Sequence, residues 1–219
     1  MNTLTAISLL LDRLYEEAVA VESATNAAVA DLSGEKLTRM MRSKTEYPDL
    51  YSRLRDFPLA VSRETGALLY ILARGCGART IVEFGTSFGL STLYLAAALR
   101  DNGGGRLITS ELEPSKAAKA RQNLTEGGLI DLVEIREGDA LHTLRADLPE
   151  TIDFLLLDGA KALYPEILDL MESRLRPGAL ILADDADESP DYVARVRSKA
   201  GGYMSAPLTA DVELSIRLG

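Results

Sequence analysis

The sequence predicts an α/β fold in which helices cover both faces of one mostly parallel sheet of seven strands. From residue 80 onward, short apolar stretches alternate with stretches of helical spacing, which is typical of a parallel sheet. Several of the apolar stretches end in acidic residues, at the sheet edge where open parallel sheets bind ligands. The last two expected strands follow each other closely, so we expect one of them to run antiparallel.

The N-terminal part of the chain predicts helices but contains no recognisable motif. Apolar side chains recur at helical spacing over residues 3–30, and residues 32–42 predict a second helix. Residues 43–58 hold two prolines and predict a loop with a short turn. We therefore expect residues 1–57 to form a helical cap on a single domain, whose main part covers residues 58–219. The apolar faces of these helices must be buried somewhere, so we also expect a homodimer.

The remaining elements follow from apolar patterning, N-caps and glycine or proline punctuation. The expected strands cover residues 80–84, 106–110, 133–136, 152–157, 179–183, 203–207 and 212–218. The expected helices cover residues 62–74, 89–99, 114–124, 140–148, 165–175 and 191–199.

Composition narrows the class of protein. Hydrophobic residues make up 47% and charged residues 26% of the 219 residues, as in ordinary globular proteins. The net charge of −9 disfavours binding to a nucleic-acid backbone, which requires clustered Lys and Arg. The single cysteine cannot form a disulfide within the chain, and no apolar run reaches the ~18 residues that a membrane span needs. We therefore expect a cytoplasmic protein with no membrane segment.

The first expected strand ends in the turn Glu83-Phe-Gly85-Thr-Ser-Phe-Gly89. Gly85 allows the backbone to approach a ligand closely, and Gly89 opens a helix whose free N–H groups can face a carboxylate. The spacing differs from the G-x-G-x-x-G dinucleotide motif and lacks its phosphate cradle. An acid ahead of the first glycine suits the ammonium group of an amino acid. S-adenosylmethionine (AdoMet) carries that ammonium and no phosphate, so the turn indicates an AdoMet site.

Acidic residues also end the next two expected strands. Glu111 can accept hydrogen bonds from both ribose hydroxyls, as acids do at this position in dinucleotide folds. Asp139 can accept from the adenine amino group. Each acid alone could be a solvated turn residue, but together at successive strand ends they favour a nucleoside ligand.

Three more carboxylates follow the two central buried strands. Asp158 ends one strand, with Lys161 three residues later, and Asp184 and Asp185 end the next. Converging carboxylates repel one another, and a hard divalent cation such as Mg²⁺ is the usual remedy. Such a cation would hold two neighbouring oxygens of a substrate, and Lys161 could then accept the proton of the reacting hydroxyl. Lys161 could instead serve only to neutralise part of the acidic charge.

In this order the motifs resemble the cation-dependent class I O-methyltransferases, which include the catechol and caffeoyl-CoA O-methyltransferases. The resemblance covers about residues 58–219, and it implies a Rossmann-like AdoMet-dependent methyltransferase fold. It implies an AdoMet site lined by Val61, Glu83, Gly85, Ser91, Glu111, Asp139 and Asp158. It also implies Asp158, Asp184 and Asp185 as Mg²⁺ ligands, Lys161 as general base and Glu213 as a substrate contact. The expected activity is transfer of a methyl group to a hydroxyl of a small molecule with vicinal oxygens.

The sequence departs from the family pattern at one point. The family usually has Asp-Asn where this chain has Asp184-Asp185, and the aromatic residue that often follows is absent. The extra carboxylate should preserve metal binding, but the substrate wall differs, so an amine or another acceptor stays open. A nicotinamide-dependent dehydrogenase and a non-enzymatic AdoMet-binding protein are the remaining alternatives. The glycine spacing disfavours the dehydrogenase, and Lys161 beside three acids disfavours a pure binder.

Three aromatic residues precede Val61 in the expected loop, namely Tyr47, Tyr51 and Phe57. They could pack over a planar substrate or over the N-terminal helices, and the sequence leaves both arrangements open.

Overall fold

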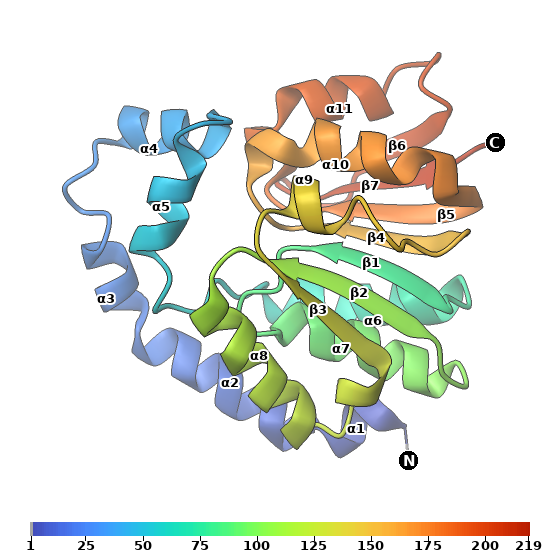
Figure 1. Ribbon diagram of the computed structural model, residues 1–219, viewed down its shortest axis with the longest axis horizontal. Helices are drawn as coiled ribbons and strands as arrows, with labels where there is room; N and C mark the ends of the chain where they lie inside the picture. Colours follow the sequence, from blue (N-terminus) through green and yellow to red (C-terminus); the bar gives the residue numbers. More distant parts are fainter. Residues whose placement is uncertain (1) are drawn as a thin grey trace.

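The computed structural model describes residues 2–219. Its seven strands form one sheet in the order β3-β2-β1-β4-β5-β7-β6 (Figure 1). The strands are β1 (Thr80–Phe84), β2 (Arg106–Glu111), β3 (Val133–Glu137), β4 (Ile152–Leu157), β5 (Leu175–Ala183), β6 (Tyr203–Pro207) and β7 (Glu213–Arg217). Strands β1 to β5 pair in parallel, and β7 runs antiparallel to both of its neighbours. The predicted Rossmann-like sheet with one antiparallel strand is confirmed.

The helices lie N-terminal to the sheet and between its strands. They are α1 (Thr3–Ala6), α2 (Ser8–Ala20), α3 (Glu22–Ala27), α4 (Gly34–Arg42), α5 (Tyr47–Arg53), α6 (Arg63–Gly75), α7 (Leu90–Asp101), α8 (Pro114–Glu126), α9 (Ala140–Thr143), α10 (Tyr164–Met171) and α11 (Pro190–Val196). Within residues 2–219, no helix is long and apolar enough to cross a membrane.

Several sequence-based boundaries need correction. The helix expected over residues 165–175 ends as α10 at Met171, and the strand expected over residues 179–183 begins as β5 at Leu175. The helix expected over residues 3–30 is broken at Ile7 and Val21 into α1, α2 and α3. The loop expected over residues 43–58 contains α5, because Pro48 lies in its first turn, where a missing N–H costs no helical hydrogen bond. The helix expected over residues 140–148 ends as α9 at Thr143.

Helices cover both faces of the sheet because successive strand residues point to opposite sides. Ile81 packs in a cluster with α2, α6, α7 and α8, whereas its neighbour Val82 packs in a second cluster with α10 and α11. In β5, Leu182 packs in the first cluster and its neighbour Ile181 packs in the second. Strands buried on both faces explain the unbroken apolar runs in the sequence.

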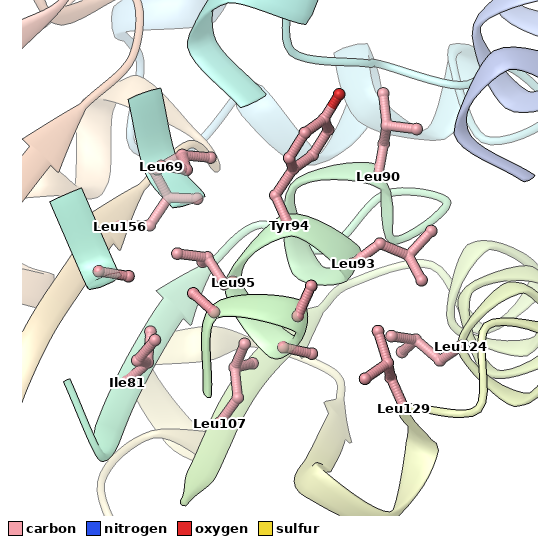
Figure 2. Packing of buried hydrophobic residues seen from close by; sticks show 14 of the residues in the cluster. Leu69, Ile81, Leu90, Leu93, Tyr94, Leu95, Leu107, Leu124, Leu129 and Leu156 are labelled. Atoms are coloured by element: carbon pink, nitrogen blue, oxygen red, sulfur yellow. The ribbon is translucent and has the colours of Figure 1, made fainter. Parts of the chain in front are cut away.

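Helix α7 is the centre of the first layer of helices. Its residues 90–99 are all buried, as expected for a helix that is apolar on every side. Figure 2 shows Leu93 close to Leu124 and Leu129, with Leu95 on the side of α7 toward the sheet. Helix α2 covers this layer from outside through Leu10 and Leu11. Helix α2 therefore completes the core on this face of the sheet.

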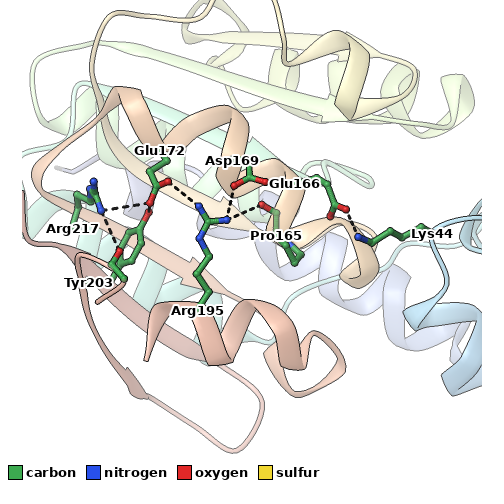
Figure 3. A network of polar contacts seen from close by, with 9 residues as sticks. Lys44, Pro165, Glu166, Asp169, Glu172, Arg195, Tyr203 and Arg217 are labelled. Atoms are coloured by element: carbon green, nitrogen blue, oxygen red, sulfur yellow. Dashed lines mark hydrogen bonds and ion pairs between the residues drawn. The ribbon is translucent and has the colours of Figure 1, made fainter. Parts of the chain in front are cut away.

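The α4–α5 pair stands apart from α2, at one end of the sheet (Figure 1). It has a small core of its own, formed by Leu32, Met40 and Leu50. Lys44, between the two helices, pairs with Glu166 of α10 (Figure 3). This ion pair connects the α4–α5 pair to the C-terminal half of the sheet domain.

A network of charged groups joins the last elements of the chain (Figure 3). Arg195 of α11 pairs with Asp169 at 2.6 Å and with Glu172 at 2.8 Å. Glu172 also accepts a hydrogen bond of 2.7 Å from the hydroxyl of Tyr203 on β6. These contacts hold α11 and β6 against α10.

Replacing Leu93 by alanine tests the role of α7. Leu93 is fully buried, so Leu93→Ala should lower the free energy of unfolding by about 2–5 kcal/mol. Urea denaturation measures the loss. Leu9→Ala is the matched control, because Leu9 is 83% exposed on α2 and its truncation should change stability by less than about 0.5 kcal/mol. Equal effects of the two variants would contradict the packing described.

Candidate active site

A pocket opens at the carboxyl ends of β1, β2, β3 and β4, and we name it the strand-end pocket. The predicted site residues among its lining are Val61, Gly85, Ser91, Glu111, Asp139 and Asp158. Parallel strands bring their carboxyl ends to one edge of the sheet, so residues far apart in sequence converge there. The structure therefore brings six of the predicted cofactor residues together.

Gly85 lies where the turn after β1 and the turn after β4 approach each other. Its φ of +102° lies in the region that favours glycine. A Cβ atom at this position would lie 2.4 Å from the carbonyl oxygen of Asp158. The missing side chain therefore lets the turn after β1 and the turn after β4 touch.

Glu83 lies beneath the pocket and is not part of its wall. The residue is fully buried, and its carboxylate accepts hydrogen bonds from the hydroxyls of Ser91 at 2.7 Å and Thr92 at 2.6 Å. Burial raises the pKa of Glu83 to about 7, although the hydroxyls of Thr109, Thr92 and Ser91 oppose the rise. In this arrangement Glu83 supports Ser91 from below, and direct contact with an ammonium group stays a prediction.

The carboxylate of Glu111 is oriented by hydrogen bonds from the backbone. Its carboxylate already accepts from the N–H groups of Ser87 at 2.7 Å and Glu113 at 2.9 Å, which fix its orientation. Asp139 begins α9 and accepts from the N–H of Leu141 at 2.9 Å. The two acids line the same pocket at the ends of adjacent strands.

Lys116 is a pocket residue that the sequence analysis missed. It lies in the first turn of α8, is 2% exposed and lines the strand-end pocket. Burial lowers the pKa of Lys116, although the carboxylates of Glu111 and Glu113 oppose the change. A lysine in a helix normally extends into solvent, so its residue type did not predict a buried position. The one sequence signal was its location five residues after Glu111.

The acids at the ends of β4 and β5 surround the amine of Lys161. Lys161 is 4% exposed, and its Nζ lies 3.0 Å from Asp158 and 3.3 Å from Asp185. Burial alone would lower the pKa of Lys161, but Tyr164 and the two carboxylates outweigh it and raise the pKa well above its usual value. Lys161 is therefore a buried ammonium ion in this arrangement.

Asp184 is the acid of this cluster without a direct ion pair to Lys161. Burial raises the pKa of Asp184 to about 7, and the nearby carboxylate of Asp158 adds to the rise. Crowded negative charge of this kind is what a cation relieves. Across residues 2–219, however, no three acidic, histidine or cysteine side chains are arranged to hold a metal ion. As they stand, the predicted ligands do not form a metal site, because Lys161 holds two of them.

A second pocket, which we name the outer pocket, adjoins the strand-end pocket. Its floor includes Asp158, Lys161, Asp184 and Asp185, and its walls come from residues 25–61. Four residues line both pockets and so form the boundary between them, namely Tyr51, Leu59, Val61 and Asp158.

Helix α5 places two of the aromatic residues over the strand-end pocket. Tyr47 and Tyr51 both line it and make an edge-to-face contact with a centroid separation of 6.4 Å. The hydroxyl of Tyr51 donates to the carbonyl of Gly159 at 3.1 Å. Both tyrosines thus line the strand-end pocket, whereas Phe57 lines neither of the two pockets.

Glu213 is the predicted site residue that the structure does not bring to these pockets. Its carboxylate is 2% exposed and accepts from Arg197 at 2.8 and 2.6 Å and from Ser205 at 2.5 Å. With these hydrogen bonds in place, Glu213 ties β7 to α11 and β6. Its predicted contact with a substrate hydroxyl is not part of this arrangement.

The raised pKa of Glu83 gives a test by pH. In the folded state Glu83 keeps its proton up to about pH 7, whereas in the unfolded chain it loses the proton near pH 4.5. Glu83 therefore makes the free energy of unfolding fall as the pH rises from 5 to 7.5. Glu83→Gln removes the effect, which amounts to at most about 3 kcal/mol. Urea unfolding at both pH values, with exposed Glu35→Gln as control, measures it. The same pH dependence in wild type and Glu83→Gln would contradict the assignment.

Comparison with known proteins agrees with this geometry. Residues 82–186 match a family model described as a methyltransferase domain. A protein of Mycolicibacterium smegmatis assigned to the O-methyltransferases is 32% identical over 151 residues, which are 64% of this chain and 71% of that protein. A catechol O-methyltransferase of Niastella koreensis is 39% identical over 130 residues, 58% of each protein. The match thus spans little more than half of that enzyme's length.

Solved structures show the same fold. TomG, an O-methyltransferase of Streptomyces achromogenes involved in tomaymycin synthesis and solved in complex with SAM, is 27% identical with a TM-score of 0.64. The likeness covers 93% of this chain and 99% of TomG. Cofactor-bound Rv0187 from MTB has a TM-score of 0.69 at 24% identity, over 86% of this chain and 93% of that one. The sequence matches, the strand order and the pocket at the strand ends agree that the chain belongs to the class I O-methyltransferase family.

Proposed function

We propose that the protein transfers a methyl group from AdoMet to a hydroxyl of a small molecule that carries two neighbouring oxygens. The observation that carries this proposal is the shared boundary between the strand-end pocket and the outer pocket. Two ligands, one in each pocket, would meet at Asp158 and Tyr51. An enzyme that transfers a group between two bound molecules needs such a meeting point.

AdoMet is proposed for the strand-end pocket. Glu111 would accept from the ribose hydroxyls, and Asp139, at the end of the next strand, would accept from the adenine amino group. The amino-acid end would then extend past Gly85 toward Asp158. The absence of a phosphate motif in the turn after β1 favours AdoMet over a dinucleotide.

The acceptor is proposed for the outer pocket, with its oxygens on the polar floor. Its hydroxyl oxygen attacks the methyl carbon of AdoMet in line with the carbon–sulfur bond. The new oxygen–carbon bond forms as the carbon–sulfur bond breaks, and the electron pair stays on sulfur as the neutral thioether S-adenosylhomocysteine. The hydroxyl proton goes to Lys161 as general base. Holding the two reactants in this alignment would contribute much of the rate.

Lys161 faces an electrostatic obstacle to this role. Asp158 and Asp185 stabilise its ammonium form, and a base must first be a free amine. A divalent cation on Asp158, Asp184 and Asp185 would supply positive charge that lowers both this pKa and that of the acceptor hydroxyl. The crowded carboxylates support such a cation, and the ion pairs of Lys161 oppose it. Removal of divalent cations therefore distinguishes these two arrangements.

An assay with and without chelator tests the proposal. With AdoMet and catechol, mass spectrometry should detect a product heavier by one methyl group and an equal amount of S-adenosylhomocysteine. EDTA should reduce the rate at least tenfold, and added Mg²⁺ should restore it. Activity that EDTA leaves unchanged would reject the cation while keeping the methyl transfer. Methylation of amines alone would replace the hydroxyl acceptor.

Substitution of Lys161 separates its two possible roles. Arginine keeps the positive charge but cannot accept a proton at neutral pH. If Lys161 is the base, Lys161→Arg and Lys161→Met should both lower kcat by about 100-fold or more. Affinity for AdoMet, measured by calorimetry, should change less than about threefold, as it should in the exposed control Lys36→Arg. An arginine variant that retains most of the activity would show that charge alone matters.

A further inference from the structure

Given the methyl transfer proposed above, we propose that the outer pocket selects acceptors whose body is apolar, uncharged and larger than a bare catechol ring. We further propose that the N-terminal helices α3, α4 and α5 make this selection. The reacting oxygens would lie on the acid–lysine floor, and the rest of the acceptor would lie against residues 25–54.

The wall opposite the polar floor is apolar. It consists of side chains from α4, α5 and the segment before α4, namely Val29, Leu37, Met41, Leu50 and Leu54. All of these except Leu50 are only partly buried, so they present apolar surface to the pocket as well as to the small core around Met40. An acceptor that covers this surface would gain the free energy of removing it from water.

The same wall offers no partner for a charged group. Among the described residues that line it from positions 25 to 61, Tyr51 carries the one ionisable side chain, and its hydroxyl is bonded to Gly159. Thr25 and Asn26 are its other polar members. A charge moved from water into such surroundings without a partner is costly. An acceptor with a carboxylate or an ammonium on its tail should therefore bind poorly.

The size of the pocket points to more than one ring. The cavity volume is about 400 Å³, within the range of about 300–1,000 Å³ found for pockets that hold drug-sized ligands. A bare catechol would leave much of the apolar wall exposed to water. An alkyl or aryl substituent opposite the reacting oxygens would cover it.

Two partly exposed ion pairs connect the wall to the C-terminal half of the chain. Arg42 of α4 pairs with Glu188 at 2.7 Å, and Lys44 pairs with Glu166. Glu188 follows Asp184 and Asp185 closely in the chain, so the same loop carries the acids and the anchor of α4. The apolar wall is therefore connected to the loop that carries the acids of the floor.

Four acceptors with the same head group test the selection. They are catechol, 4-propylcatechol, and two 4-substituted catechols whose chain of the same length ends in an ammonium or a carboxylate. Each buried methylene should improve binding about fourfold, so kcat/KM for 4-propylcatechol should exceed that of catechol at least tenfold. Both charged compounds should fall at least tenfold below 4-propylcatechol. Charged compounds that equal or exceed it would overturn the proposal.

Calorimetric binding of the same four compounds to the S-adenosylhomocysteine complex keeps this test separate from the proposed function. If the affinities follow the predicted order but no methyl group is transferred, the pocket is as proposed and the methyl transfer is wrong. If methyl groups are transferred without any preference for the propyl compound, the selection is wrong and the methyl transfer stands.

A matched pair of substitutions assigns the effect to the wall. Met41→Gln places an amide in the wall, whereas Met204→Gln makes the same change at a residue that is 67% exposed on the edge strand β6. The ratio of kcat/KM for 4-propylcatechol to that for catechol should fall about fivefold in Met41→Gln and stay at the wild-type value in Met204→Gln. Equal ratios in both variants would place the selection elsewhere.

Discussion

The N–H of Asp158 donates a hydrogen bond of 2.8 Å to the carbonyl of Phe84, and the next residue, Gly85, passes the same loop with no room for a side chain. This contact joins the turn after β1 to the turn after β4. The first turn forms the strand-end pocket, and the second carries the acid–lysine cluster. The parallel pairing of β1 with β4 makes the contact possible, and the missing Cβ of Gly85 makes it close. This contact therefore sets the position of the two pockets relative to each other.

Electrostatic balance is the second constraint, and it differs between the two pockets. In the strand-end pocket, backbone N–H groups hold Glu111 in place, and Lys116 offsets part of its charge. In the acid–lysine cluster, one buried ammonium faces three carboxylates and pairs with two of them, so negative charge is left in excess. The strand-end pocket is thus organised to accept hydrogen bonds from a neutral nucleoside. In the proposed reaction, this cluster would take up the proton of the acceptor hydroxyl.

Much of this could be predicted from the sequence, because strands buried on both faces and acids at strand ends leave strong local patterns. The turn from Glu83 to Gly89 and the acids after β2, β3 and β4 lie where the patterns placed them. Helix α5 was missed because two prolines suggested a loop. For Tyr47 and Tyr51 the sequence left two arrangements open, and the structure places both in the lining of the strand-end pocket. The pairing of Lys161 with nearby acids was one of the two roles that the sequence left open. Lys116 and the hydrogen bonds around Glu213 depend on which distant side chains meet. Patterns in a single sequence do not predict such contacts between side chains.

The central claim is that one edge of the sheet holds the methyl donor against the acceptor floor. A crystal structure of the S-adenosylhomocysteine complex tests it most directly. The adenosine should lie between Glu111 and Asp139, and the sulfur should face the boundary formed by Tyr51, Leu59, Val61 and Asp158. A ligand bound elsewhere, or a sulfur atom directed away from the outer pocket, would contradict the account.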